Sequence, residues 1–87
     1  MSAEVASALA DALKVNKSVT TVDLYDNEIG DDGAAALASA LKVNTSLTSI
    51  NLSCNNICDN GASALADALK VNASLTFFYD EYLFQFQ

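Results

Sequence analysis

Two cysteines are the first side chains in this sequence whose chemistry must be considered. Cys54 and Cys58 are separated by three residues, and the chain contains no histidine. Two thiolates cannot fill the four positions that zinc prefers, and a redox pair is more typically Cys-x-x-Cys near a helix N-terminus. The simpler interpretation is a pair of small loop residues, because Cys58 matches Gly30 in a similar stretch 28 residues earlier.

The densest group of carboxylates is a second candidate for chemistry, as a cation site. It consists of Asp23, Asp26, Glu28, Asp31 and Asp32. This run lacks the spaced oxygens and central glycine of an EF-hand calcium loop, so we expect a solvated loop rim. The sequence also contains no arginine, no nucleophile–base pair and no phosphate-cradling glycine loop. We therefore predict that the protein is not an enzyme and uses no cofactor and no metal.

Composition limits the classes of partner. The 87 residues leave room for one small domain, and 11 acidic residues against 4 lysines give a formal charge of −7. The field of such a chain repels nucleic acid and anionic membranes, so we expect neither as a partner. Apolar residues make up 52% of the chain, which argues against disorder.

The sequence also bears on location. No stretch has the roughly 18 uninterrupted apolar residues of a membrane helix. Residues 1–10 contain Glu4 and no basic residue, unlike a secretory signal. Two cysteines are too few for a disulfide framework. We expect a cytoplasmic protein with both thiols reduced.

A 28-residue repeat organises the whole chain. The text SALADALKVN at 7–16 returns as AALASALKVN at 35–44 and again as SALADALKVN at 63–72. Residues 33–48 and 61–76 are identical at 13 of 16 positions. Alanine-rich composition alone cannot keep leucine, lysine, valine and asparagine in register over three copies, so the copies are structural repeats.

Each copy has a helical half and a strand half. Ala34, Leu37 and Leu41 fall on one face of a helix, and Asn44 after Lys42 predicts a left-handed stop. Alternating apolar residues follow, as in a short strand. We predict helices at about 3–15, 31–43 and 59–71, and strands at about 19–24, 47–52 and 75–79. One helix–strand pair cannot bury its apolar face alone, so the copies must stack with parallel strands.

The repeated residues resemble the leucine-rich repeat consensus. The matching text is Leu47-x-x-Ile50-x-Leu52-x-x-Asn55-x-Ile57, preceded by Val19-x-x-Val22-x-Leu24-x-x-Asn27-x-Ile29. The 28-residue period with a full helix is similar to the ribonuclease-inhibitor subclass, which includes nucleotide-binding immune receptors and Ran GTPase-activating proteins. The activity of the latter cannot be carried onto any residue here, since no arginine is present.

The resemblance implies an α/β fold, a short solenoid with parallel strands on the concave side and helices on the convex side. It also implies that Asn27 and Asn55 turn inward and hydrogen-bond to loop backbone between repeats. We expect a single domain over 1–87, with repeats at about 5–32, 33–60 and 61–87. The last copy becomes atypical from residue 80, because Asp80 stands where Leu52 would be expected.

The polar and aromatic positions between the buried strand residues are candidates for binding another protein. Side chains alternate across a strand, so these positions project to the concave side. The candidates are Asp23, Tyr25, Asn51, Ser53, Phe77 and Tyr79. Aromatic area beside polar groups is typical of contact patches, although an ordinary solvated strand face is the alternative.

The C-terminal segment is strongly aromatic and departs from the repeat. Tyr82, Leu83, Phe84 and Phe86 lie in a run without proline or charge, which favours pairing with another strand. Three interpretations remain open: a cap on the last repeat, a segment that pairs with another chain, and a reading-frame artefact.

Two functional hypotheses follow from these features. The first is a non-catalytic protein–protein interaction module, a fragment of a longer repeat array, since near-perfect repeats begin directly after Met1-Ser2. The alternative is a self-assembling structural protein, a homo-oligomer or filament that stacks through its exposed repeat ends and aromatic tail.

Overall fold

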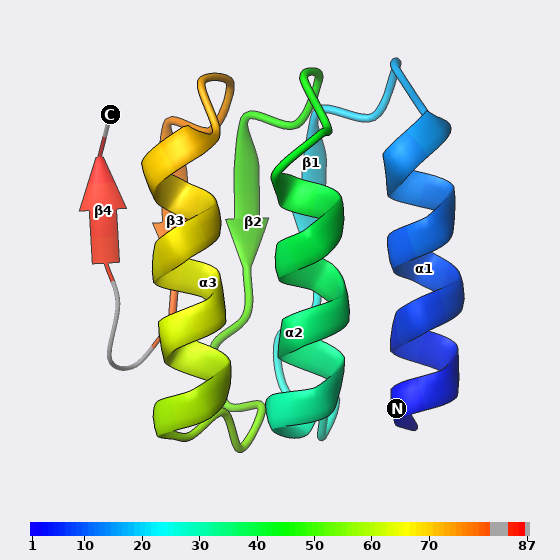
Figure 1. Cartoon of the computed structure of the whole chain (residues 1–87), viewed down its shortest axis with the longest axis vertical. Helices are drawn as coiled ribbons and strands as arrows, with labels where there is room; N and C mark the ends of the chain where they lie inside the picture. Colours follow the sequence, from blue (N-terminus) through cyan, green and yellow to red (C-terminus); the bar gives the residue numbers. More distant parts are fainter. Residues whose placement is uncertain (81–83, 87) are drawn as a thin grey trace.

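A computed structural model describes residues 1–80 and 84–86, which form three helices and four strands (Figure 1). Helices and strands alternate along the chain, and one further strand follows at the C-terminal end. In order the elements are α1 (Ala3–Val15), β1 (Thr21–Asp23), α2 (Gly30–Leu41), β2 (Ser49–Asn51), α3 (Asp59–Val71), β3 (Phe77–Tyr79) and β4 (Phe84–Phe86).

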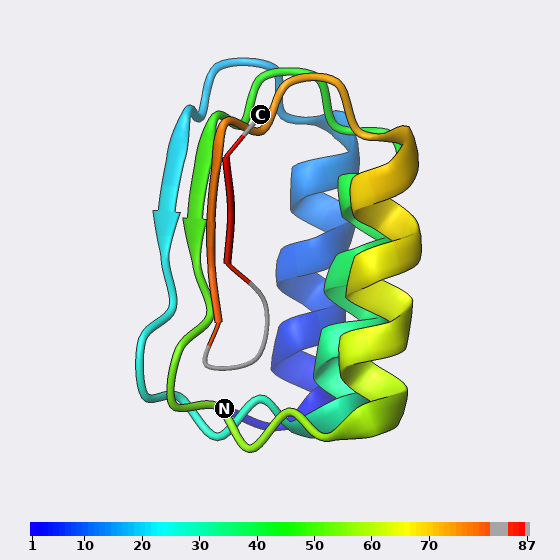
Figure 2. The same cartoon turned by 90° about the vertical axis from the view of Figure 1, so that its left-hand side faces the viewer.

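The strands form one sheet in the order β1-β2-β3-β4, covered on one face by a layer of helices (Figure 2). The first three strands are parallel, and Val22, Ile50 and Phe78 stand opposite one another, one repeat apart. In Figure 1 the helices lie side by side with their C-terminal ends at the same edge. The predicted α/β leucine-rich repeat fold is therefore confirmed.

The core lies between the sheet and the helices. Eight large apolar residues from the second and third copies are fully buried there: Leu37, Leu41, Leu47, Ile50, Leu52, Leu65, Leu75 and Phe78. Leu37, Leu41 and Leu65 follow the helix period of 3.6 residues, and Ile50 and Leu52 follow the strand period of 2. The apolar pattern of the helices and strands is thus buried, whereas the repeated Lys-Val pair is exposed in every copy.

The predicted boundaries are correct for α1 and α3 and differ for α2. This helix ends at Leu41, two residues early, because the N–H groups of Val43 and Asn44 both donate to the carbonyl of Ala40 and tighten the last turn. The three parallel strands have three residues each, fewer than predicted.

Glycines allow the helices to approach one another closely. A Cβ added at Gly33 would lie 3.2 Å from Ala6 Cβ in α1 and 2.6 Å from Ile29 Cγ2. At Gly61 it would lie 3.1 Å from Ala34 Cβ and 2.6 Å from Asp31 Oδ1. The first copy has Val5 at this position, and its side chain is 53% exposed.

Asn44 does not act as the predicted left-handed stop. The described residues with positive φ are Asp26, Glu28, Cys54 and Asn56, in the loops that precede a helix, and Gly30, the first residue of α2. The side chain of Asn44 is instead buried and bridges two copies. Its Nδ2 donates to the carbonyl of Leu13 (2.8 Å), and its Oδ1 accepts from the N–H of Leu47 (2.8 Å).

The C-terminal strand β4 pairs with β3 of the same chain, antiparallel, with Phe86 opposite Phe77 and Phe84 opposite Tyr79. The outer edge of β3 is thus covered within the molecule rather than by another chain. Of the predicted tail residues, Tyr82 and Leu83 lie outside the described residues. Among the described helices, none is both long enough and apolar enough to cross a membrane.

Candidate functional site

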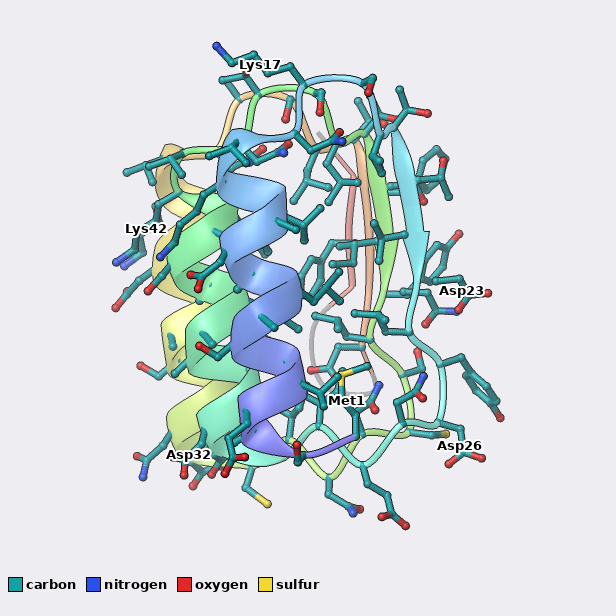
Figure 3. The ribbon with its side chains drawn as sticks, turned by 90° about the vertical axis from the view of Figure 1, so that its right-hand side faces the viewer. Met1, Lys17, Asp23, Asp26, Asp32 and Lys42 are labelled. Carbon is teal, nitrogen blue, oxygen red and sulfur yellow. The ribbon has the colours of Figure 1, made fainter. Side chains whose placement is uncertain are left out.

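The side of the sheet away from the helices, here called the strand face, carries all six residues predicted to contact a partner. Asp23, Asn51, Phe77 and Tyr79 lie in the three parallel strands, and Tyr25 and Ser53 lie just beyond β1 and β2. Their neighbours Val22, Ile50 and Phe78 point into the core, so alternation turns the candidates outward. Figure 3 shows Asp23 on this outer side, across the sheet from α1.

Three aromatic side chains are exposed on the strand face. Tyr25 is 56% exposed, Phe77 38% and Tyr79 37%. The rings of Phe77 and Tyr79 are stacked, with centroids 6.2 Å apart and planes inclined by 8°. Because stacking fixes both rings, they offer a flat apolar surface that loses little conformational entropy when it is covered.

Two polar side chains are fixed by their own turns. Asp23 Oδ1 accepts from the N–H of Tyr25 (3.1 Å), and Asn51 Oδ1 accepts from the N–H of Ser53 (3.0 Å). Asp23, Asn51 and Tyr79 stand in register on adjacent strands. The strand face therefore brings a carboxylate, an amide and stacked aromatic rings into one row, a combination suited to recognition of a surface.

The two loop asparagines lie elsewhere and differ from each other. Asn55 is buried, and its Nδ2 donates to the carbonyls of Leu24 (2.8 Å) and Leu52 (2.9 Å). Its Oδ1 accepts from the N–H of Asn27 (2.7 Å). Asn27 is half-buried, and its Nδ2 donates to the carbonyl of Tyr25 in its own turn. Asn55 thus links two copies, whereas the Asn27 side chain acts within one.

The structure also shows where the two cysteines and the acidic residue Asp31 lie. Cys54 and Cys58 are exposed and are not joined in a disulfide. Asp31 Oδ1 accepts from the N–H of Cys58 (2.7 Å) and so links the loops of adjacent copies. Within residues 1–80 and 84–86, no cluster of three or more histidine, cysteine or acidic residues could hold a metal ion.

An open cavity of about 310 Å³ lies beside the start of α3 and is lined by Ile57, Cys58, Asp59 and Ala62. It contains no residue of the strand face. Among the described residues, its lining combines one carboxylate, that of Asp59, with one thiol, that of Cys58.

Sequence reasoning missed two repeated features of the structure. The first is the buried row of Asn44 and Asn72, which bridge adjacent copies. The second is an exposed edge where each helix ends, occupied in every copy by a lysine and a valine. The signal for both was the text Lys-Val-Asn, which recurs unchanged in all three copies.

Comparisons with known proteins agree with this architecture. A solved structure titled "Leiomodin-1 Actin-Binding Site 2 (ABS2)" superposes with a TM-score of 0.83 and is 32% identical in sequence. The match covers 95% of this chain and 49% of that one, so the chain spans about half the length of this neighbour. Among curated proteins, none matches.

The match to a family model rests on consecutive copies of the repeat. A model described as "Leucine Rich repeat" matches residues 15–38 and 43–66, two stretches that begin 28 residues apart and together span more than half of the chain. The helix–strand order and the inter-repeat asparagines described above are the structural counterpart of that match. This protein belongs to the leucine-rich repeat family.

Proposed function

We propose that this protein is a non-catalytic module that binds another protein through its strand face. The observation that carries the proposal is the exposed, stacked pair of Phe77 and Tyr79 beside the fixed side chains of Asp23 and Asn51. Tyrosine and phenylalanine are enriched at protein interfaces, where buried aromatic anchors supply most of the binding energy.

The chemistry of the strand face favours a partner with apolar and basic groups. Asp23 is exposed and lies in the row that ends at Tyr79, so a lysine or arginine of the partner can pair with the carboxylate while its stem covers a ring. A standard interface buries about 800 Å² on each partner. Three short strands offer less, so we expect weak binding here and stronger binding by a longer array of such repeats.

Actin is the first partner to test. The neighbour's title names an actin-binding site, and the match covers 95% of this chain at 32% identity. The chain matches only half of that structure, so we expect lower affinity than a complete site would have. The proposal of actin as a partner rests on this similarity alone. The proposal of the strand face as the binding surface rests on the geometry of its side chains.

The test is a titration of labelled actin, monomeric and filamentous, with the chain and two variants. We expect the double variant Tyr25→Ala, Tyr79→Ala to weaken binding at least tenfold. A tenfold loss corresponds to about 1.4 kcal/mol of binding free energy, which is a modest effect for the removal of two aromatic side chains from an interface. Val5→Ala serves as the control, since Val5 is 53% exposed, close to the 56% of Tyr25, but lies in the first turn of α1. Unchanged binding of the double variant would remove the strand face from the proposal.

A second candidate function is self-association through the C-terminal end. It is favoured by the position of β4 at the edge of the sheet and by a sequence without charge from Tyr82 to Phe86. Light scattering of the full chain and of residues 1–80 separates the two roles of this segment. Assembly of the full chain alone supports self-association, whereas assembly of the shortened chain alone shows that β4 protects the edge of β3.

A further inference from the structure

All four lysines of this acidic chain lie at the edge where the helices end, here called the lysine–valine edge. It consists of Lys14 and Val15 at the end of α1, Lys17 just beyond it, Lys42 and Val43 after α2, and Lys70 and Val71 at the end of α3. In Figure 3, Lys17 and Lys42 lie at this end, and Asp26 and Asp32 lie at the opposite end. The molecule is therefore electrically polarised along its helices.

The three valines of this edge are strongly exposed. Val15 is 77% exposed, Val43 57% and Val71 63%. Isolated exposed apolar side chains are ordinary, but these three form a row along one edge, one in each copy. Helices that pack in contact lie about 8–10 Å apart, so the row spans about 16–20 Å.

Packing explains the asparagine that follows each lysine–valine pair, but it does not explain the pair itself. Asn44 and Asn72 are buried and bond to the carbonyls of Leu13 and Leu41 in the preceding helix. A cation in the last turn of a helix is favoured by the helix dipole, which accounts for a lysine there. It does not account for a valine left in solvent beside that lysine in every copy.

The charges at this edge are only partly neutralised. Lys14 pairs with Asp11 (3.7 Å) and Lys70 with Asp67 (3.5 Å). The matching position in the second copy is Ser39, and Lys42 has no ion pair within the described part of the chain. Lys17 lies beyond α1 and likewise has no ion pair among these residues. The remaining acidic residues of the described ranges lie outside the helix C-terminal turns.

We propose that the lysine–valine edge binds an acidic amphipathic helix of a partner protein. The valines offer the apolar contact, and the lysines, above all Lys42 and Lys17, offer complementary charge to carboxylates on either side. An α-helix rises about 1.5 Å per residue, so residues six to seven apart lie about 9–10.5 Å apart along its axis and can meet successive valines.

A helix of this kind suits the edge better than a nucleic acid or a membrane. The net charge of −7 repels any large anionic surface that extends past the edge. A single helix laid across the three helix ends contacts the lysines while it stays away from the carboxylates at the opposite end. This edge also lies apart from the strand face, so the proposal for this edge and the proposal for the strand face can be tested independently.

The experiment uses the intact chain and a synthetic helical peptide of about three heptads, with leucine at every seventh position and glutamate on both flanks. A matched peptide carries lysine in place of glutamate. Fluorescence anisotropy gives the affinity, and amide NMR spectra of the labelled chain locate the contact. We expect saturable binding of the acidic peptide, none of the basic one, and shifts centred on residues 14–17, 42–44 and 70–72.

Variants with matched exposure make the test specific. We expect Lys42→Glu and Val43→Ser each to weaken binding about fivefold, which corresponds to about 1 kcal/mol. Val5→Ser is the control, because Val5 (53% exposed) and Val43 (57%) are almost equally exposed, but Val5 lies in the first turn of α1, at the other end of the helices. Val5→Ser should leave the affinity unchanged, and circular dichroism should show all three variants folded.

Several results would overturn the proposal. These are no saturable binding of the acidic peptide, shifts centred on the strand face, or loss of affinity in Val5→Ser but not in Val43→Ser. Tighter binding of duplex DNA or of phosphatidylserine vesicles than of the peptide would also overturn the assignment to a protein partner. None of these outcomes depends on whether the strand face binds actin.

Discussion

Side-chain amides carry much of the cohesion between the copies. Asn55 donates to three carbonyls and Asn72 to two, in each case including one of the preceding copy, and each accepts from backbone N–H groups with its oxygen. A buried polar group is costly unless its bonds are made, so these asparagines stabilise the stack only when the preceding copy is in place. Position in the array therefore decides what each asparagine contributes.

Asn55 and Asn27 give a direct test at the residue scale. We expect Asn55→Ala to lower the free energy of unfolding by at least about 2 kcal/mol, because it leaves buried carbonyls and N–H groups unpaired. Asn27→Ala should cost under about 1 kcal/mol, since that side chain is half-buried and bonds within its own turn. Urea unfolding followed by circular dichroism measures both, and equal losses would contradict this assignment.

A glycine between two helices gives a second test. Alanine normally stabilises a helix by about 1 kcal/mol relative to glycine. At Gly61 the new Cβ would lie 2.6 Å from Asp31 Oδ1, which already accepts from the N–H of Cys58. We expect Gly61→Ala to destabilise the protein by about 1–2 kcal/mol as this contact is pushed apart. The exposed neighbour Asn60→Ala should be neutral or stabilising, and a stable Gly61→Ala protein would refute close packing here.

Elements with a repeated local pattern could be predicted from sequence. Features that depend on contacts with distant parts of the chain could not. The periodicity of leucine and alanine located α1 and α3 correctly, and Ile50 and Leu52 located β2. The Tyr82–Phe86 run predicted a strand, but sequence could not say whether that strand would pair with β3 or with another chain. Asn44 was misassigned because its bonds reach residues about one repeat away, where local turn rules give no information.

The positions of the helices in the stack predict a gradient of local stability. Among the described helices, α2 alone is packed between two others, and Ala34, Leu37 and Leu41 are fully buried. End elements of a repeat array open at lower free energy than central ones. We expect amide hydrogen exchange to be slower in α2 than in α1 or α3 when followed by mass spectrometry or NMR. Faster exchange in α2 than in α1 would contradict the idea that contacts with neighbouring copies raise the local stability of a helix.

At the scale of the whole molecule, the two ends of the stack differ in chemistry. The α1 end carries Val5, where the second and third copies have Gly33 and Gly61. Both glycines lie close to an alanine of the preceding helix, and a branched side chain there has no room. At the other end β4 covers the edge of β3. Regular growth by stacking copies is thus opposed at the α1 end, and any self-association is more favourable through the outer edge of β4.

Insertion of one more copy tests whether the molecule is a sum of equivalent units. A second copy of residues 33–60 placed after residue 60 would set its first glycine against Ala34, as Gly61 is set now. We expect a higher urea midpoint, because each internal repeat adds its own interface, and an m-value larger by roughly a third, in proportion to the added surface. The same insertion with valine in place of that glycine should lose the gain in midpoint, since it recreates at an internal position the side chain found at Val5. An insertion that lowers the midpoint with glycine, or gains equally with valine, would show that the copies do not stack through this contact.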